Sequence, residues 1–378
     1  MDTTLTEEQN LLRDSALRFV RNEYEFERRC ALADSDDGFS RAHWATFADL
    51  GWLAMPLPEA HGGLGGGATE MAVLMEAFGR GLVLEPYLAT IVLGAGLIAA
   101  SGSEAQKGEI LPAVAGGNML LALAHGEPQA RFDLNDVASI AKKDEKGGGY
   151  VLDGHKAVVW HAGAADKLLV SARTAGGQRD EKGISIFIID SASKGVTIRS
   201  YATNDGQRAG EVLLEGVSVA GEAMVGKEGA GLPAIEAVID RARVALAAEA
   251  VGAMAALVEQ TQDYLKTRKQ FGVPLSKFQV LQHRLVEMFN EHQMAQALTF
   301  RACATLDNGA PAAIARTAAA VKAQSGKAGK FVGQQAVQLH GGMGMTDELP
   351  VGHYFKRLSM IDALFGNADF HLARFAGM

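Results

Sequence analysis

The spacing of apolar residues changes twice along this chain, and this change limits the possible folds more than any other feature. Up to residue 117 the apolar residues, such as Ala16 and Val20, recur at the helical spacing of about 3.6 residues. From residue 118 the spacing falls to two, and after residue 228 it becomes helical again. The pattern predicts three domains: an α-helical domain at 1–117, a β domain at 118–227 and a helical bundle at 228–378.

The middle region contains short β-type segments separated by turns rich in Gly, Asp, Asn and Lys. Short strands at this density predict an antiparallel sheet that is either closed or stacked as a sandwich. The expected strands are Tyr150–Gly154, Leu168–Ala172, Ile184–Ile189, Val196–Arg199 and Glu211–Leu214.

The last region contains long helical windows separated by breaks that hold Gly or Pro. The windows are Leu232–Lys266, Gln279–Leu306 and Ala312–His340. Their many alanines allow helices to approach closely, either within one bundle or across a subunit interface.

Composition narrows the class of protein. Lys and Arg number 36 and Asp and Glu number 44, and the net charge of −8 argues against general binding to nucleic acid. The apolar stretch Tyr87–Ala100 is too short to cross a bilayer. Two cysteines exclude a disulfide framework, and the N-terminus is acidic where a leader peptide is basic. These features predict a soluble cytoplasmic protein.

Two motifs in the last region contain residue types that bind phosphate. Arg268-Lys269-Gln270-Phe271-Gly272 places an arginine and an aromatic ring just after a helix, and Gln338-Leu339-His340-Gly341-Gly342-Met343-Gly344 places glycines at a helix end. An arginine can bind a phosphate, and glycines allow backbone N–H groups to approach a pyrophosphate. Each motif alone also fits an ordinary helix terminus.

The motifs taken in order give a more specific result. With Leu5-Thr6-Glu7-Glu8-Gln9, the Pro58–Gly65 loop and Gly154-x-Lys156, they make the chain resemble the acyl-CoA dehydrogenase family over nearly its whole length. The resemblance implies an α-helical domain, a β domain and a C-terminal four-helix bundle. It also implies FAD bound between two subunits and removal of hydrogen from Cα and Cβ of an acyl-CoA thioester.

In that family one group of residues contacts the adenosine-diphosphate part of the FAD held by the neighbouring subunit. The resemblance assigns this role here to Arg268, Phe271, Gln279, Gln338, Gly341, Gly342 and Gly344. The motif positions of the whole group are intact.

The catalytic base of the family is missing. Family members usually read Tyr-Glu-Gly-Thr where this chain reads Leu364-Phe365-Gly366-Asn367, so Phe365 stands at the position of the base. A second subset places its Glu beside the bundle arginine, and that position is Ala242, next to Arg243. Neither residue can take a proton from a thioester.

The contacts to the flavin ring are also depleted. The β-domain loop that usually offers a Thr before Glu-Pro has Gly126 before Glu127. The usual Trp-x-Thr becomes Val158-Val159-Trp160, which leaves Trp160 as a flavin tryptophan shifted by two residues. We therefore expect a base-lacking subunit of a hetero-oligomeric enzyme, most similar to the small subunits of pimeloyl-CoA dehydrogenase type enzymes. Its partners would be a homologous large subunit and an electron-transfer flavoprotein.

Other interpretations stay open. A self-sufficient enzyme would need a relocated base, for which Glu249, Asp362 and Asp369 are the candidates. Asp240 and Arg243 match the CoA side of the family's pocket, and their spacing equally suits a local ion pair. A non-catalytic scaffold is the third interpretation. Basic residues on one bundle helix are expected to form a solvated face or to lie beside the flavin phosphates: Arg316, Lys322, Lys327 and Lys330.

Overall fold

The computed structural model describes residues 5–144 and 147–378, which form two compact units that interleave along the sequence. The first unit comprises the described part of Met1–Ala31 together with Gly67–Val83 and Arg243–Met378. The second comprises Leu32–Gly66 and Leu84–Ala242.

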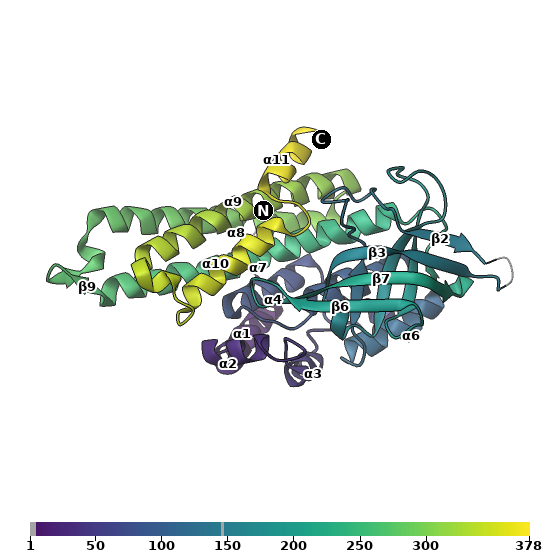
Figure 1. Cartoon of the computed structure of the whole chain (residues 1–378). Helices are drawn as coiled ribbons and strands as arrows, with labels where there is room; N and C mark the ends of the chain where they lie inside the picture. Colours follow the sequence, from purple (N-terminus) through teal and green to yellow (C-terminus); the bar gives the residue numbers. More distant parts are fainter. Residues whose placement is uncertain (1–4, 145–146) are drawn as a thin grey trace. The chain divides into compact units, whose positions relative to one another are not determined.

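The first unit is helical, and its long helices run alongside one another (Figure 1). Thr6 caps the first helix in a capping box: its hydroxyl accepts from the N–H of Gln9 at 3.2 Å, and the Gln9 side chain accepts from the N–H of Thr6 at 3.0 Å. The helices that lie in this unit wholly or in part are α1 (Glu7–Glu23), α2 (Phe26–Ala33), α4 (Ala68–Gly81), α7 (Leu232–Thr267), α8 (Gln279–Asn308), α9 (Pro311–His340), α10 (Pro350–Ala363) and α11 (Ala368–Ala376). A short hairpin, β9 (Lys269–Gln270) and β10 (Val273–Pro274), and the 3-10 turns η5 (Leu275–Lys277) and η6 (Gly341–Met345) join them.

Helices α4 and α7 touch backbone to backbone at two glycines. A Cβ at Gly79 would lie 1.9 Å from the carbonyl oxygen of Glu249, and one at Gly252 would lie 1.8 Å from that of Glu76. No side chain fits at either position, so the crossing of these helices depends on both glycines.

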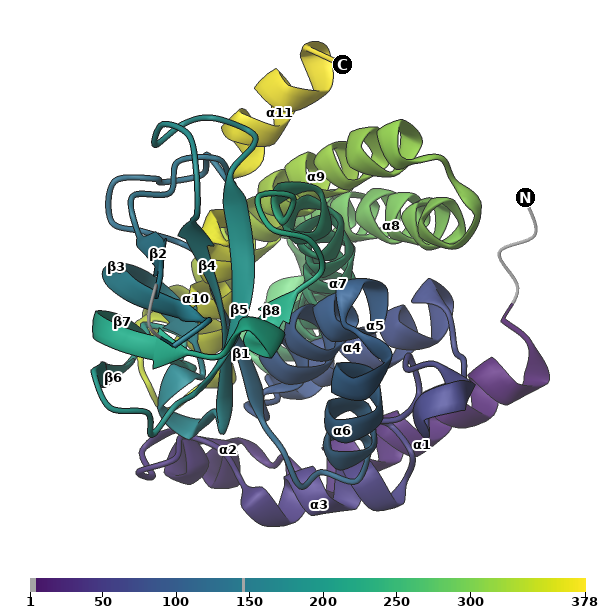
Figure 2. The same ribbon diagram turned by 90° about the vertical axis from the view of Figure 1, so that its right-hand side faces the viewer.

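The second unit is built around one sheet with the strand order β6-β7-β3-β2-β4-β5-β8, and β1 pairs with β4 (Figure 2). Most pairs are antiparallel, while β1 and β2 run parallel to β4. The strands are β1 (Leu121–Ala124), β2 (Ile140–Lys143), β3 (Tyr150–Trp160), β4 (Lys167–Arg173), β5 (Ile184–Asp190), β6 (Val196–Ala202), β7 (Arg208–Val219) and β8 (Met224–Val225). The unit also contains α3 (Arg41–Asp49), η1 (Glu59–His61), the π-helical η2 (Leu88–Ala95), α5 (Gly96–Ser101), α6 (Glu104–Ala115), η3 (Ala162–Ala164) and η4 (Gly221–Ala223).

The order of helical, β and helical regions predicted from the sequence is confirmed. Among the described residues, no helix combines the length and the apolar character that a membrane crossing requires.

Candidate flavin clamp and base-position loop

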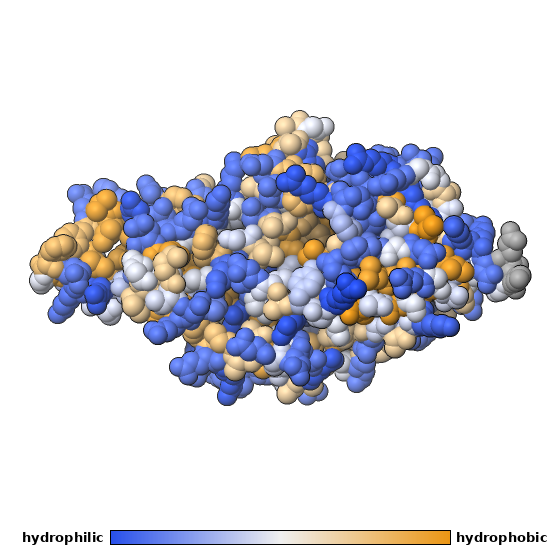
Figure 3. Space-filling model, in the orientation of Figure 1, coloured by the Kyte–Doolittle hydropathy of each residue, from blue (hydrophilic) through white to orange (hydrophobic). Residues whose placement is uncertain are grey.

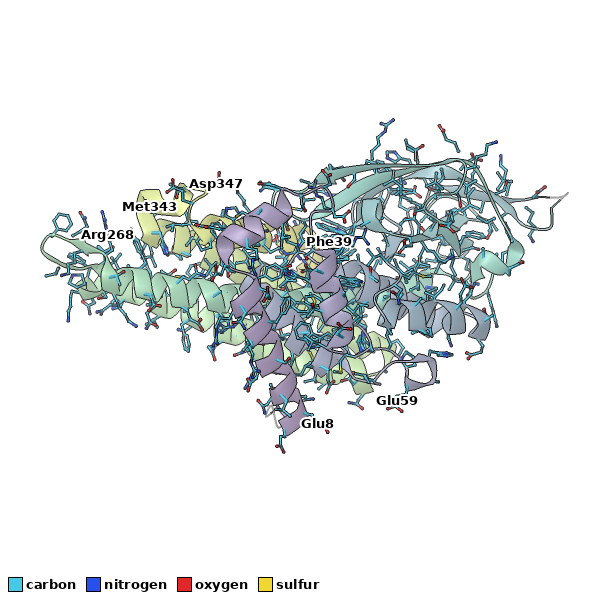
Figure 4. All side chains as sticks on the ribbon, turned by 90° about the horizontal axis from the view of Figure 1, so that it is seen from below. Glu8, Phe39, Glu59, Arg268, Met343 and Asp347 are labelled. Carbon is cyan, nitrogen blue, oxygen red and sulfur yellow. The ribbon has the colours of Figure 1, made fainter. Side chains whose placement is uncertain are left out.

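The phosphate-binding motifs meet at one end of the helical unit. The Tyr264 ring stacks on that of His340 with centroids 4.4 Å apart, which brings the end of α7 beside the glycine motif after α9. Arg268 directly follows the last residue of α7, and its N–H donates to the Tyr264 carbonyl at 2.8 Å. Figure 4 shows Arg268 and Met343 toward the same end of the long helices.

The β9–β10 hairpin presents an aromatic ring to the outside. Phe271 and Gly272 form its two-residue loop with φ of 54° and 81°, a geometry that favours glycine rather than phenylalanine. The Phe271 side chain is 91% exposed and contacts the Phe278 ring edge-on at 6.1 Å. A strained backbone that exposes an aromatic ring indicates a surface used for binding.

We call the residues assigned to the cofactor's adenosine-diphosphate part the clamp: Arg268, Phe271, Gln279, Gln338, Gly341, Gly342 and Gly344. The polar side chains of the clamp have no partner within the described part of the chain. Arg268, Gln279 and Gln338 are exposed, and no side-chain hydrogen bond or ion pair engages them there. A Cβ on Gly341 or Gly342 would meet nothing within 4 Å, whereas one on Gly344 would lie 2.7 Å from the Val337 carbonyl oxygen. The first two glycines thus leave open space above exposed backbone, and Gly344 is required by the close turn.

The loop at the base position is held in the opposite way, by donors from within the same unit. Phe365 has φ of 54°, and its carbonyl accepts from Arg243 Nε at 3.0 Å and from His371 Nε2 at 2.9 Å. Lys322 Nζ donates to the carbonyls of Asp362 and Gly366, each at 2.8 Å. These hydrogen bonds fix the backbone of the loop. The side chain at the base position, that of Phe365, is nevertheless a phenyl ring with no group that accepts a proton.

Burial sets the charge of two of these donors. It lowers the pKa of His371 to about 3, with Arg243 adding to the effect, so the ring is neutral and carries its proton on Nε2. Burial also lowers the pKa of Lys322 to about 7. Lys322 is fully buried, so its expected place on a solvated face is wrong. The helix-spacing pattern missed this because a lysine can bury its stem where backbone carbonyls receive its ammonium group.

The candidates for a relocated base are placed as follows. Glu249 forms a two-point ion pair with Arg357, at 2.6 and 2.8 Å, and both side chains are 5% exposed. The Asp362 carboxylate accepts from the N–H of Ala368 at 2.9 Å, at the start of α11. Asp369 is exposed in the first turn of α11. Ion pairing and helix capping account for the first two carboxylates.

Asp240 and Arg243 are both buried on α7. Arg243 is committed to the loop at Phe365, a role that the spacing of the motif did not suggest. One sequence signal that could have indicated these donors is the group of basic residues on α9, which includes Lys322.

In the second unit, the sheet contains an irregularity where the flavin-ring residues were expected. The β3–β7 register shifts between Lys156 and Val159, and Val158 in this bulge has φ of 53° and is 49% exposed. Trp160 lies past the bulge, pairs with Ala209 and is 7% exposed. The exposed residue beside the Gly126 loop is therefore an aliphatic one, and Gly126 offers no hydroxyl.

Buried polar networks hold this part of the sheet, and the strand pattern did not predict them. Glu127 accepts from Lys156 Nζ at 2.5 Å, and Lys156 also donates to Ser171 at 3.1 Å. Burial raises the pKa of Glu127, but Lys156 and further donors outweigh burial and lower it below its usual range. Glu211 accepts from Tyr201 at 3.0 Å and from the Val158 N–H at 3.4 Å. These networks fix the Gly126 and Val158 backbones without adding ring contacts.

Comparison with known proteins gives the family. The family models of the acyl-CoA dehydrogenase N-terminal, middle and C-terminal domains match residues 6–118, 122–217 and 229–376. The chain therefore belongs to the acyl-CoA dehydrogenase family, whose members are FAD-dependent oxidoreductases.

Its relatives match over almost their whole length. The short-chain specific acyl-CoA dehydrogenase of Clostridium acetobutylicum is 30% identical over 98% of this chain and 97% of its own. A variant of the Tcur3481–Tcur3483 steroid ACAD superposes with a TM-score of 0.88 at 30% identity, covering 99% of this chain and 98% of its own. The ChsE4–ChsE5 complex from Mycobacterium tuberculosis gives 0.89 at 26% identity, covering 100% and 98%.

Proposed function

We propose that this chain is the base-lacking subunit of a hetero-oligomeric acyl-CoA dehydrogenase and that it lends its clamp to FAD held by a homologous large subunit. One observation carries the proposal: the loop at the base position is firmly held but presents Phe365, while the clamp side chains of Arg268, Gln279 and Gln338 are exposed and have no partner among the described residues. An abstracted α-proton needs a group that can accept it, and a phenyl ring has none.

The residues fit part of the cofactor. Arg268 and Gln338 supply donors for the pyrophosphate, and Phe271 supplies an exposed aromatic surface. FAD, when bound, accepts the hydride from the β-carbon of the thioester. Gly126 and Val158 offer no side-chain donors to a flavin ring, which supports a ring seated in the partner subunit rather than in this one.

The outward surface of the bundle end supports a protein partner. Val280, Val286, Phe289 and Met294 on α8 are each at least half exposed. Apolar colours also gather at the end of the molecule that carries the β9–β10 hairpin (Figure 3). Exposed apolar side chains at this density are typical of subunit interfaces. The names of two relatives, Tcur3481–Tcur3483 and ChsE4–ChsE5, each join two components.

The alternative of a self-sufficient enzyme with a relocated base receives less support. The ion pair with Arg357 engages both oxygens of the Glu249 carboxylate, which supports a structural role for this side chain rather than that of a base. A non-catalytic scaffold remains the alternative in which no partner restores activity.

The acyl group and the electron acceptor belong to the proposal as well. The sequence resemblance suggests a dicarboxylyl-CoA of the pimeloyl type, and the steroid ACAD relative suggests a larger, rigid acyl group. An electron-transfer flavoprotein is the acceptor that the family resemblance implies.

Coexpression with the product of an adjacent acyl-CoA dehydrogenase-like gene tests the proposal. The complex is expected to hold flavin and to reduce a dye when an acyl-CoA is added. Arg268→Ala should release flavin from the complex, while Glu249→Gln should leave its thioester-dependent rate within about twofold if the complex remains folded. A complex that forms but stays colourless and inactive would favour the scaffold.

A further inference from the structure

A cavity of about 260 Å³ lies inside the helical unit, lined by residues of α1, α4, α7 and α8. It is separate from the clamp and from the base-position loop, whose residues do not line it. Its apolar wall includes Leu17, Val251 and Phe300, which come from three different helices. The lining also includes polar side chains, and a concave space that combines apolar walls with a few polar groups is the usual form of a small-molecule site.

One polar group in the wall is a carboxyl without a partner. Glu76 lines the cavity from α4, and among the described residues no donor forms a hydrogen bond with it and no cation lies within ion-pair distance. Burial raises its pKa, and the more distant Arg80 and Arg13 offset part of that increase. A half-buried carboxyl that finds no donor in the fold is costly unless something else binds it.

A second polar group lines the cavity from another helix. Gln296 lines it from α8, and its amide likewise has no hydrogen-bond partner within the described part of the chain. Thr299, one turn further, already donates to the Ala295 carbonyl at 2.8 Å. The amide of Gln296 and the carboxyl of Glu76 therefore line the same cavity.

The charges around the cavity select the sign of its ligand. Arg80 is held by Glu259 in a two-point pair at 2.9 and 3.0 Å, whereas Arg13 from α1 has only a 3.6 Å contact with the exposed Asp14. The residues that α7 contributes are apolar, and α8 adds only the thiol of Cys303 among titratable groups. When Glu76 is protonated, the available charge is that of Arg13, and the cavity favours an anion.

We propose that this cavity binds a short unbranched monocarboxylate such as butyrate or hexanoate. Its head would accept hydrogen bonds from the Glu76 carboxyl and the Gln296 amide and would be attracted by Arg13. Its alkyl chain would contact Leu17, Val251 and Phe300. Two carboxyl groups in one site share a proton, so binding takes up one proton wherever free Glu76 is ionised.

Calorimetric titration of the full chain with sodium hexanoate, at matched ionic strength, tests this site. The affinity should fall by up to about tenfold per pH unit above the pKa of Glu76, and the binding heat should depend on the buffer as one proton is taken up. Hexylamine and hexanol should bind more weakly. Stronger binding of hexylamine would overturn the proposal, and so would an absence of hexanoate binding at millimolar concentration at pH 5.5.

Variants sharpen the test. Glu76→Gln keeps a donor, so it should retain hexanoate binding and lose the pH dependence. Gln296→Ala and Arg13→Gln should each weaken binding about tenfold or more. The matched control is Gln293→Ala, on the same helix but outside the cavity lining, which should leave the affinity unchanged.

A space-filling variant gives an independent result. Val251→Phe should abolish binding, and its folding can be checked by its thermal unfolding. Should this variant fail to fold, the exposed Arg13→Gln still decides the matter. Equal hexanoate affinity in Arg13→Gln, Gln296→Ala and the unaltered chain would contradict the assignment.

Discussion

Two regions of the same helical unit differ in whether their polar groups have hydrogen-bond partners within the chain. At the bundle end, Arg268, Gln338 and the Gly341 backbone are exposed, and the side chains of the first two have no partner among the described residues. At the base-position loop, Arg243 donates to the carbonyl of Phe365, and Lys322 donates to the carbonyls of Asp362 and Gly366. Polar groups without a hydrogen-bond partner in the fold are available to bind another molecule, whereas polar groups that are hydrogen-bonded within the chain stabilise its own structure.

This difference distinguishes the two roles that the proposal gives these regions: the clamp can bind a cofactor, and the base-position loop cannot abstract a proton. Phe365 and Gly366 have positive φ, and donors from α7 and α9 hold the backbone of this loop, but the phenyl ring of Phe365 cannot accept a proton. At the proposed clamp, the side chains of Arg268 and Gln338 are exposed. Four predictions probe this comparison, from the largest expected effect to the smallest.

The strongest effect is expected from the ion pair between Glu249 and Arg357. Arg357→Leu leaves the buried Glu249 carboxylate without its cation and should lower the free energy of unfolding by about 3–5 kcal/mol. Denaturant unfolding measures this loss. Lys143→Ala, which breaks the exposed pair with Glu228, is the control and should cost about 0–1 kcal/mol. Similar losses in the free energy of unfolding for the two variants would show that the ion pair does not hold Glu249, which would again be a candidate for the base.

Arg268→Ala is expected to separate binding from stability. The side chain has no partner in the fold, so the unfolding free energy of the isolated chain should change by less than about 0.5 kcal/mol. In the assembled protein, loss of a charged donor should weaken flavin retention about tenfold or more. Flavin absorbance after gel filtration checks this. Unchanged retention would mean that the open groups serve something other than the cofactor.

Two glycines offer a matched pair of alanine substitutions. Gly366 has φ of 105°, and a Cβ there would lie 2.5 Å from Phe370, so Gly366→Ala should destabilise the chain by about 1–3 kcal/mol or more. Gly342 has open space, so Gly342→Ala should be nearly neutral for stability. Thermal unfolding of both variants makes the measurement, and the reverse order would contradict the assignment of closed and open regions.

The pH dependence of stability should contain a contribution from His371. Its pKa is lowered to about 3 in the folded chain from about 6.5 when unfolded, so the unfolded state binds more protons between these values. Stability should therefore fall as the pH falls from about 6.5 toward 3. His371→Asn should flatten this part of the profile relative to the unaltered chain, as measured by urea unfolding at several pH values. An identical slope in the variant would show that His371 is not buried in its neutral form.

The sequence predicted the fold well because periodicity and motif order are properties of whole segments. The long helices Gln279–Asn308 and Pro311–His340 begin and end within two residues of the expected windows. The expected strand Tyr150–Gly154 instead extends to Trp160 through a bulge, since a register shift between paired strands leaves no mark on one strand's own sequence.

The features of the site could be predicted from the sequence only where they depend on the chemical identity of a single residue. The absence of a base at Phe365 follows from the chemistry of phenylalanine alone. The pairing of Glu249 with Arg357, 108 positions later, and the burial of Lys322 against loop carbonyls depend on which helices meet. Spacing within a single helix carries no information about such contacts.

The most direct test of the central claim is turnover by the chain alone. Purified chain supplied with FAD, an acyl-CoA and an electron-accepting dye should show no thioester-dependent reduction, and activity should appear only when the homologous large subunit is added. Sustained turnover by the isolated chain, at a rate comparable to that of the complex, would contradict the account.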